Sequence, residues 1–265
     1  MNVYQIFERV GREKPLVHHI TNYVTIYDCA NITRVFGALP VMAHAKEESA
    51  DMAAIASSLV LNIGTLTPDL VKSMILAGQS ANRKGIPVVL DAVGVGATRL
   101  RDDAAAELLE SIRIDVVKGN ASEIARLAGV DVKTRGVESA KVEADLEQIA
   151  KKLALEKKAT VVITGKVDIV TDGRKTFLVK NGHEMMGKIV GTGCMAASVI
   201  GAFVAVEKDH PLACAAALSV YGIAAELAAK KSRGPGSFKE NLFDEVYNLN
   251  REKIEGMSKI EEKTA

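Results

Sequence analysis

The stretch Gly191-Thr192-Gly193-Cys194-Met195-Ala196-Ala197 is the part of the chain around which the rest is organised. Two glycines flank a threonine, and small and apolar residues continue to Val206, which predicts a glycine-rich turn that opens directly into a helix. The first N–H groups of a helix have no partner within the helix, and the helix dipole adds positive charge there. Residues 191–194 therefore suit a phosphate, and Cys194 would lie where a thiolate is favoured. The alternative is an ordinary glycine turn before a buried helix.

Helical and strand patterns alternate along the rest of the chain. The segment 58–63 is almost continuously apolar, which is typical of a strand buried on both faces. Asp172-Gly173 separates two short strand-like segments and predicts a hairpin. The expected strands are 16–20, 38–42, 58–63, 88–90, 114–117, 160–163, 167–171 and 175–179. The expected helices are 3–11, 25–36, 47–56, 67–85, 100–112, 124–128, 137–155, 194–207, 211–230 and 238–255.

This alternation predicts an α/β protein with a mostly parallel central sheet and helices on both faces. The hairpin would add an antiparallel edge. No linker, repeat or low-complexity stretch divides the chain, so we expect one domain over residues 1–265. The last helix should stop at Gly256, and the charged tail around Glu261-Glu262 should be a solvated surface.

The composition argues against several classes of protein. A net charge of +1 is not that of a nucleic-acid or anionic-membrane binder, and no apolar run is long enough to span a membrane. The N-terminus has no signal-peptide pattern, and the three cysteines offer no C-x-x-C pair or even disulfide framework. We therefore expect a reduced, cytoplasmic protein. Cys29 and Cys214 lie in apolar helical patterns and should be buried packing residues.

Polar residues follow the predicted strands at their C-terminal ends, where ligands bind in open α/β sheets. Asp91 and Glu123 could hold Mg²⁺ largely through water, although each could be a solvated loop carboxylate or a helix cap. A cap is equally plausible for Glu123, because residues 120–123 resemble a capping box. Lys118 could neutralise phosphate or form a salt bridge at a strand end, and Thr164-Gly165 could contact a nucleotide.

The sequence contains no P-loop. Gly165-Lys166 and Gly187-Lys188 are followed by valine and isoleucine, where a P-loop has serine or threonine. A nucleotide would therefore have to be held in another way, and the glycine-rich turn is the best candidate for binding the transferred phosphate. Phosphoryl transfer mainly needs positioning, a divalent metal and neutralisation of the phosphate oxygens.

The histidines do not form a zinc motif. His18 and His19 are adjacent, so in a strand they point to opposite faces and cannot share an ion. Neither H-x-x-x-H nor H-E-x-x-H occurs.

Taken together, these motifs identify a family. Along almost its whole length the chain resembles the 5-(2-hydroxyethyl)-4-methylthiazole kinases of the ribokinase-like superfamily. No single motif is specific, but their order along the chain is. The matching segments are 19–24 (HITNYV), 40–45 (PVMAHA), 90–97 (LDAVGVGA), 118–124 (KGNASEI), 162–165 (VITG) and 191–194 (GTGC).

The resemblance implies ATP-dependent phosphorylation of a thiazole alcohol in thiamine salvage. It also implies Mg²⁺ and a homotrimer with active sites at the subunit interfaces. The implied substrate contacts are Asn22, Met42 and Gly191, and the implied ATP contacts are Lys118, Thr164 and Gly193. Asp91 and Glu123 would lie on the magnesium side. Cys194 would be the base, at a position where sister kinases of the superfamily carry aspartate.

One residue departs from the family pattern. Many relatives have arginine where Lys118 stands, and lysine offers a point charge in place of a bidentate fork. The resemblance still implies an ATP contact there, with altered geometry. The cysteine is a weaker base than a carboxylate, but a loose transition state needs little help from a base.

Three other functions compete with this interpretation. Gly191-x-Gly193-x-x-Ala196 fits a dinucleotide-binding pattern, but that pattern normally opens a βαβ unit with an acidic residue at the end of its second strand. Asp209 is near the required distance, yet it lies between two predicted helices. A non-catalytic module that binds a thiazole or thiamine is the second alternative. A kinase for another small alcohol, such as a pyrimidine or pyridoxal, is the third.

Overall fold

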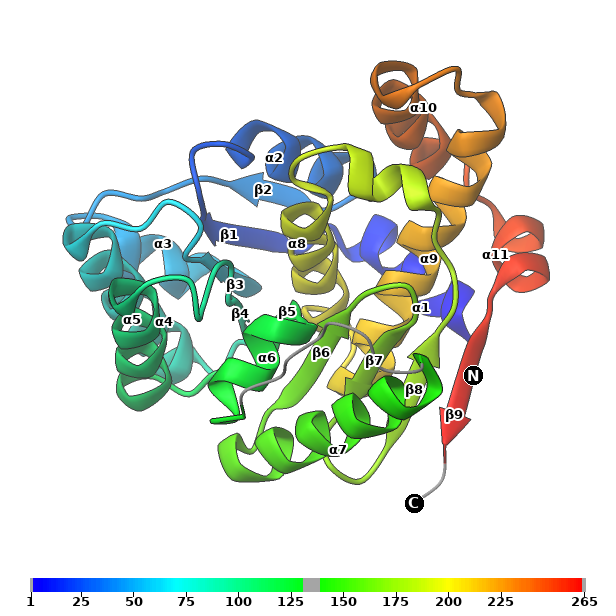
Figure 1. Ribbon diagram of the computed structural model, residues 1–265. Coiled ribbons are helices and arrows are strands. Elements are labelled where there is room, and N and C mark those ends of the chain that lie inside the picture. The colour runs from blue at the N-terminus through cyan, green and yellow to red at the C-terminus, as the bar shows by residue number, and fades with distance from the viewer. Residues whose placement is uncertain (1, 131–138, 264–265) are drawn as a thin grey trace.

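A computed structural model describes residues 2–130 and 139–263 of the chain. A single sheet of nine strands, in the order β2-β1-β3-β4-β5-β6-β7-β8-β9, runs through the described residues (Figure 1). The strands are β1 (Leu16–Ile20), β2 (Leu39–Val41), β3 (Ser58–Asn62), β4 (Val88–Asp91), β5 (Val116–Asn120), β6 (Thr160–Thr164), β7 (Asp168–Thr171), β8 (Thr176–Val179) and β9 (Ile260–Lys263). The first six strands pair in parallel, and β7, β8 and β9 pair antiparallel.

Helices cover both faces of this sheet, as the sequence predicts. One core forms beneath α1 (Val3–Glu13), α2 (Ile26–Val35), α8 (Thr192–Val204), α9 (His210–Lys231), α10 (Pro235–Tyr247) and α11 (Arg251–Met257). The other forms beneath α3 (Ser49–Ile55), α4 (Pro68–Lys84), α5 (Arg99–Ser111), α6 (Ala121–Leu127) and α7 (Ser139–Lys157). Alternate residues of a strand point to opposite faces, so Val60 enters the first core and Leu59 and Leu61 enter the second.

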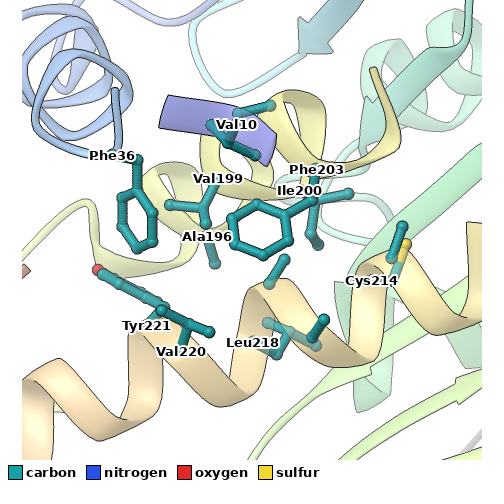
Figure 2. Close-up of a cluster of buried hydrophobic side chains, with 14 of the residues drawn as sticks. Val10, Phe36, Ala196, Val199, Ile200, Phe203, Cys214, Leu218, Val220 and Tyr221 are labelled. Carbon is teal, nitrogen blue, oxygen red and sulfur yellow. The ribbon is translucent and has the colours of Figure 1, made fainter. Parts of the chain in front are cut away.

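Helices α8 and α9 form the centre of the first core. Figure 2 shows Val199, Ile200 and Phe203 of α8 facing Leu218 and Tyr221 of α9 across an apolar cluster. The side chain of Cys214 lies in the same cluster and is fully buried, so its packing role is confirmed.

Helix α8 lies very close to the sheet. A Cβ built on Gly201 would lie 2.4 Å from a methyl carbon of Val60 on β3, so only glycine allows this approach. The N-terminus of α8 lies at the C-terminal edge of the parallel strands, where Asn22, just after β1, contacts Cys194.

Helix α9 is long and apolar enough to cross a membrane by length and composition alone, so the prediction that no apolar run reaches this length is wrong. However, 78% of its apolar window is buried inside the protein, so α9 is a helix of the protein core.

The C-terminal region differs from the prediction. The expected helix 238–255 is divided into α10 and α11, because the Asn250 side chain caps a new helix by accepting the N–H of Lys253. Gly256 lies inside α11 and does not end it. The tail around Glu261 is the strand β9, which pairs with β8. Of the expected helix 137–155, residues 137 and 138 lie outside the described residues, and the rest corresponds to α7.

Candidate active site

The glycine-rich turn has the geometry that its sequence predicts. Gly191 is the N-cap of α8 with a φ of 98°, a left-handed conformation that favours glycine. A Cβ at this position would lie 2.7 Å from the Thr25 Cγ2 methyl, so the turn also needs a residue without a side chain. Gly191 has no side chain with which to cap the helix, which leaves the first N–H groups of α8 available to an anion. Cys194 lies in the first turn and is partly exposed.

Cys194 is joined to the end of β1 by a hydrogen bond. Asn22 Nδ2 donates to Cys194 Sγ at 3.3 Å and to Asn62 Oδ1 at 3.0 Å. Asn22 Oδ1 accepts the N–H of Val24, the N–H of Thr25 and the hydroxyl of Thr25, each at 3.1 Å. The carbonyl end of Asn22 is thus occupied by donors, so its amide N–H is the group that faces the sulfur.

The hydrogen bonds that begin at Cys194 and Asn22 continue through polar side chains near the ends of β3, β4 and β5. Asn62 Nδ2 donates to Asp91 Oδ2 at 2.7 Å, and Lys118 Nζ lies 2.8 Å from Asp91 Oδ1. Asn62, Asp91 and Lys118 are all buried. We call Cys194, Asn22, Asn62, Asp91 and Lys118 the polar row.

Burial and pairing act in opposite directions on the charges of the row. Burial opposes the charge on Lys118, but the adjacent Asp91 carboxylate outweighs it and raises the pKa of Lys118. Burial raises the pKa of Asp91, although Lys118 and Asn62 partly offset this. A Cβ at Gly193 would lie 3.4 Å from Lys118 Nζ. The ammonium group is therefore directly below the first turn of α8.

Glu123 is the N3 residue of a capping box on α6. Its Oε2 accepts the N–H of Asn120 at 2.7 Å, while Asn120 Oδ1 accepts the N–H of Glu123 at 3.0 Å. Its Oε1 accepts the N–H of Gly94 at 2.8 Å. The capping interpretation is confirmed. Each carboxylate oxygen keeps further acceptor capacity, so capping does not prevent contact with a water on a metal ion.

A cleft of about 890 Å³ opens beside the N-terminus of α8. Its lining comes from the ends of β6 and β8, from the 3₁₀ helix η1 (Glu184–Lys188) and from α8 and α9. It includes Thr164, Asp168, Thr192, Gly193 and Tyr221. Burial raises the pKa of Asp168 to about 7, even though this carboxylate accepts the N–H of Gly165 at 2.9 Å. The cleft is large enough for a nucleotide and ends at the glycine-rich turn.

The structure brings most of the predicted site residues together. Gly191 lies against Thr25, which binds Asn22, and Gly193 and Thr164 line the same cleft. Met42 follows the edge strand β2, at the same end of the sheet as Asn22 but outside the polar row. The sequence reasoning missed Asn62 and Asp168. Asn62 lies at the end of the apolar strand 58–63, so it reads as part of that strand. A polar residue at the end of a buried strand is nevertheless the same signal that identified Asp91.

The histidine pair forms no metal site. His18 Nε2 lies 2.8 Å from the Ala43 carbonyl, and His19 Nδ1 lies 3.1 Å from the Val17 carbonyl, both in the buried sheet. Within residues 2–130 and 139–263, no group of three or more histidine, cysteine or acidic side chains could hold a metal ion.

A dinucleotide-binding unit is not present at the glycine-rich turn. Gly191 follows a 3₁₀ helix, and α8 is followed by α9 where a βαβ unit has a strand. Asp209 is the N-cap of α9 and pairs with Lys175. It is therefore not placed to bind a ribose.

The architecture defines the class of protein. A solved ribokinase-like superfamily protein from Enterococcus faecalis V583 superimposes with a TM-score of 0.61 at 15% identity, over 88% of this chain and 86% of the other. At that identity the likeness concerns the fold alone, and it places the chain among proteins with the ribokinase-like fold.

Closer relatives specify the family within this class. A model of the hydroxyethylthiazole kinase family matches residues 7–252. The hydroxyethylthiazole kinase of Methanosarcina mazei is 63% identical over 253 residues, which cover 96% of this chain and 97% of that protein. The structure of a hydroxyethylthiazole kinase protein from Pyrococcus horikoshii OT3 superimposes with a TM-score of 0.91 at 42% identity, over 98% of both chains. The chain belongs to the hydroxyethylthiazole kinase family and is a phosphotransferase.

Proposed function

We propose that this protein transfers the γ-phosphoryl group of ATP to the primary hydroxyl of 5-(2-hydroxyethyl)-4-methylthiazole, in thiamine salvage. The observation that carries the proposal is the position of Cys194. Its sulfur lies in the first turn of an uncapped helix, with the Asn22 amide on one side and a cleft at the same helix terminus. A hydroxyl and a triphosphate can therefore meet at this point.

Cys194 acts as the base. Asn22 donates to the sulfur, so Sγ accepts a hydrogen bond from the amide and is held in a fixed position at the helix terminus. The sulfur takes the proton of the substrate hydroxyl, whose oxygen bonds to the γ-phosphorus while the bond to the ADP oxygen breaks. Because the transition state is loose, a thiolate is a sufficient base. Asn22, Met42 and Gly191 position the thiazole alcohol.

The cleft binds ATP. Thr164 and Gly193 lie in its lining, and the first N–H groups of α8 face developing negative charge on the transferred group. Lys118 lies below Gly193 and supplies positive charge to the phosphates through a single ammonium group.

Asp91 and Glu123 fit a magnesium ion held mainly through water. Asp91 ends β4, and Glu123 lies in the first turn of α6, which follows β5 directly. Besides burial, the charge of Glu123 raises the pKa of Asp91. Their oxygens are occupied by nitrogen donors but keep acceptor capacity, which suits water-mediated contact better than direct coordination. The bound ion would neutralise charge on the phosphate oxygens.

The active form is a homotrimer with sites at its subunit interfaces. Four large apolar residues are exposed beside the part of the site where the thiazole alcohol is proposed to bind. Their exposed fractions are 63% for Tyr23, 67% for Val24, 77% for Tyr27 and 73% for Val190. The contact between Gly191 and Thr25 brings Val190 next to the start of α2, so these residues form one patch. We call it the α2 patch. An exposed apolar patch of this kind is typical of a protein–protein interface, and a second copy of the chain is its partner.

Residues 1–265 form one domain and act in the cytoplasm. The continuous nine-stranded sheet supports the first statement. The second is supported by three free cysteines, two of them buried, and by the burial of α9.

A substrate panel tests the proposal. The purified protein is incubated with Mg²⁺-ATP and each of three alcohols, namely hydroxyethylthiazole, a hydroxymethylpyrimidine and pyridoxal, and ADP release is followed. We expect the highest kcat/KM for the thiazole alcohol. Preference for another alcohol would assign a different kinase, and tight thiazole binding without ADP release would indicate a non-catalytic module.

A further inference from the structure

Asn62 is the central member of the polar row. Its side chain is 1% exposed and makes three hydrogen bonds. Oδ1 accepts from Asn22 Nδ2 at 3.0 Å and from the Gly64 N–H at 2.9 Å, while Nδ2 donates to Asp91 Oδ2 at 2.7 Å. Asn62 is the member that joins the thiol end of the row to the carboxylate–ammonium end.

The bond directions in the row are fixed from both ends, by the Asp91–Lys118 pair at one end and by the donors from Val24 and Thr25 to Asn22 Oδ1 at the other. An ionised Asp91 can only accept, so Asn62 must present its NH₂ group to that carboxylate. Its carbonyl oxygen then faces Asn22 and accepts one of the two amide hydrogens there. The other amide hydrogen of Asn22 points at the sulfur of Cys194. If the Asn62 amide were turned around, its NH₂ group would face the NH₂ group of Asn22, and its carbonyl oxygen would face the Asp91 carboxylate. Two donors would meet at one end and two acceptors at the other.

From this arrangement we infer that Asn62 is a positioning residue, which helps to hold the N–H donor that Asn22 presents to Cys194 and thereby orients the sulfur as a hydrogen-bond acceptor. The inference rests on the proposed function, in which Cys194 is the base. Asn62 itself touches neither substrate nor phosphate in this scheme. It acts through Asn22 on one side and Asp91 on the other.

Three variants separate this role from a contribution to stability alone. Asn62→Ala removes the link. Asn62→Asp keeps the shape and the acceptor toward Asn22 but places a second carboxyl 2.7 Å from the position of Asp91 Oδ2. The control is Ser58→Ala at the other end of β3, where a fully buried hydroxyl donates to the Gly201 carbonyl at 2.8 Å. The control also removes a buried hydrogen bond from this strand, but far from the row.

Two readouts are used with each variant. One is kcat and KM for hydroxyethylthiazole with Mg²⁺-ATP. The other is the rate at which iodoacetamide alkylates Cys194 at pH 7, with Cys194→Ser as the blank for the two buried cysteines. Alkylation needs the thiolate but no substrate. It therefore reports on the link even if hydroxyethylthiazole proves to be the wrong substrate and the proposed function fails.

For Asn62→Ala we expect kcat to fall about tenfold with KM within about twofold, the size expected for one oriented hydrogen bond. Alkylation of Cys194 should slow by a similar factor. Ser58→Ala should leave kcat and the alkylation rate unchanged, even if it lowers the thermal stability as much as Asn62→Ala does, or more. For Asn62→Asp we expect a loss of kcat at least as large as for Asn62→Ala, because the introduced carboxyl has no N–H to donate to Asp91.

If iodoacetamide alkylated Cys194 in Asn62→Ala at the wild-type rate, the inference would be overturned, whichever alcohol the protein phosphorylates. So would a loss of kcat shared equally by Ser58→Ala, or wild-type kcat in Asn62→Asp.

Discussion

Lys118 Nζ and Asp91 Oδ1 form a buried ion pair at 2.8 Å, with side chains only 4% and 0% exposed. The pair sits below the first turn of α8, where the transferred phosphate is proposed to bind. On the proposed function, the single charge of Lys118 would act twice: it pairs with Asp91 in the free protein and would face the phosphate in the complex. An arginine there could serve both groups with separate N–H donors, whereas lysine has to share one ammonium.

Removing one member of this pair should be costly for stability. We expect Lys118→Met to lower the free energy of unfolding by about 3–5 kcal/mol, because it leaves the Asp91 carboxylate buried without its cation. Adding Asp91→Asn to that variant should recover much of the loss. Urea unfolding of the two variants measures both effects. A loss below about 1 kcal/mol in the single variant would mean that Asp91 is not charged in the free protein.

Replacement of Cys194 tests the base. Cys194→Ala should lower kcat by about a hundredfold, at the low end for a general base because the transition state is loose. Cys194→Asp should keep or raise kcat, since a carboxylate is a competent base at neutral pH. Cys214→Ala is the control, because that thiol is fully buried in the apolar core beneath α9. Wild-type turnover in Cys194→Ala with unchanged ATP binding would show that another group takes the proton.

Asp168 should make the stability of the free protein depend on pH. Its pKa is raised from 3.8 to about 7, so the folded state holds the proton more tightly than the unfolded state. The contribution to stability is complete below about pH 3.8 and is lost as pH rises through 7. In thermal melts, the Tm of the wild type minus that of Asp168→Asn should decrease between pH 4 and pH 8. A constant difference would mean that Asp168 is solvated in the free protein.

The parallel part of the fold was predictable because its signals are local. Segments such as 58–63 are apolar on both faces, and only a strand covered by helices on both sides buries them. Gly191 was predictable for the same reason, since a left-handed turn before a helix requires glycine. The capping box at Glu123 is another local pattern, and the structure confirms it.

The missed features depend on contacts between distant segments. β9 carries two glutamates in four residues and becomes a strand through pairing with β8 and ion pairs such as Lys180–Glu261. Asn62 gains its place in the site from Asn22 and Asp91, which lie 40 and 29 residues away in the sequence. The sequence immediately around Asn62 does not predict contacts with residues so far away along the chain.

A charge in the α2 patch should disrupt self-association. Tyr27 is 77% exposed, and Tyr27→Glu would bury a carboxylate in any interface formed there. We expect a shift from trimer to monomer in light scattering and a matching loss of kcat/KM. Leu100→Glu is the control, because Leu100 is also exposed but lies on α5, across the sheet. If Tyr27→Glu remains trimeric, the interface uses another surface.

The conformation of Gly191 should be essential for both substrate sites. In Gly191→Ala the new methyl would occupy a left-handed backbone position and lie 2.7 Å from the Thr25 Cγ2 methyl. Thr25 holds the Asn22 carbonyl through two hydrogen bonds, so its displacement would misalign Asn22 against Cys194. We expect kcat/KM to fall about a hundredfold, as small misplacements of reacting groups do. Gly256→Ala on α11 is the matched control, since a Cβ there meets no atom within 4 Å and its φ needs no glycine. If Gly191→Ala kept the wild-type kcat/KM, the positive φ at Gly191 would not be needed for activity.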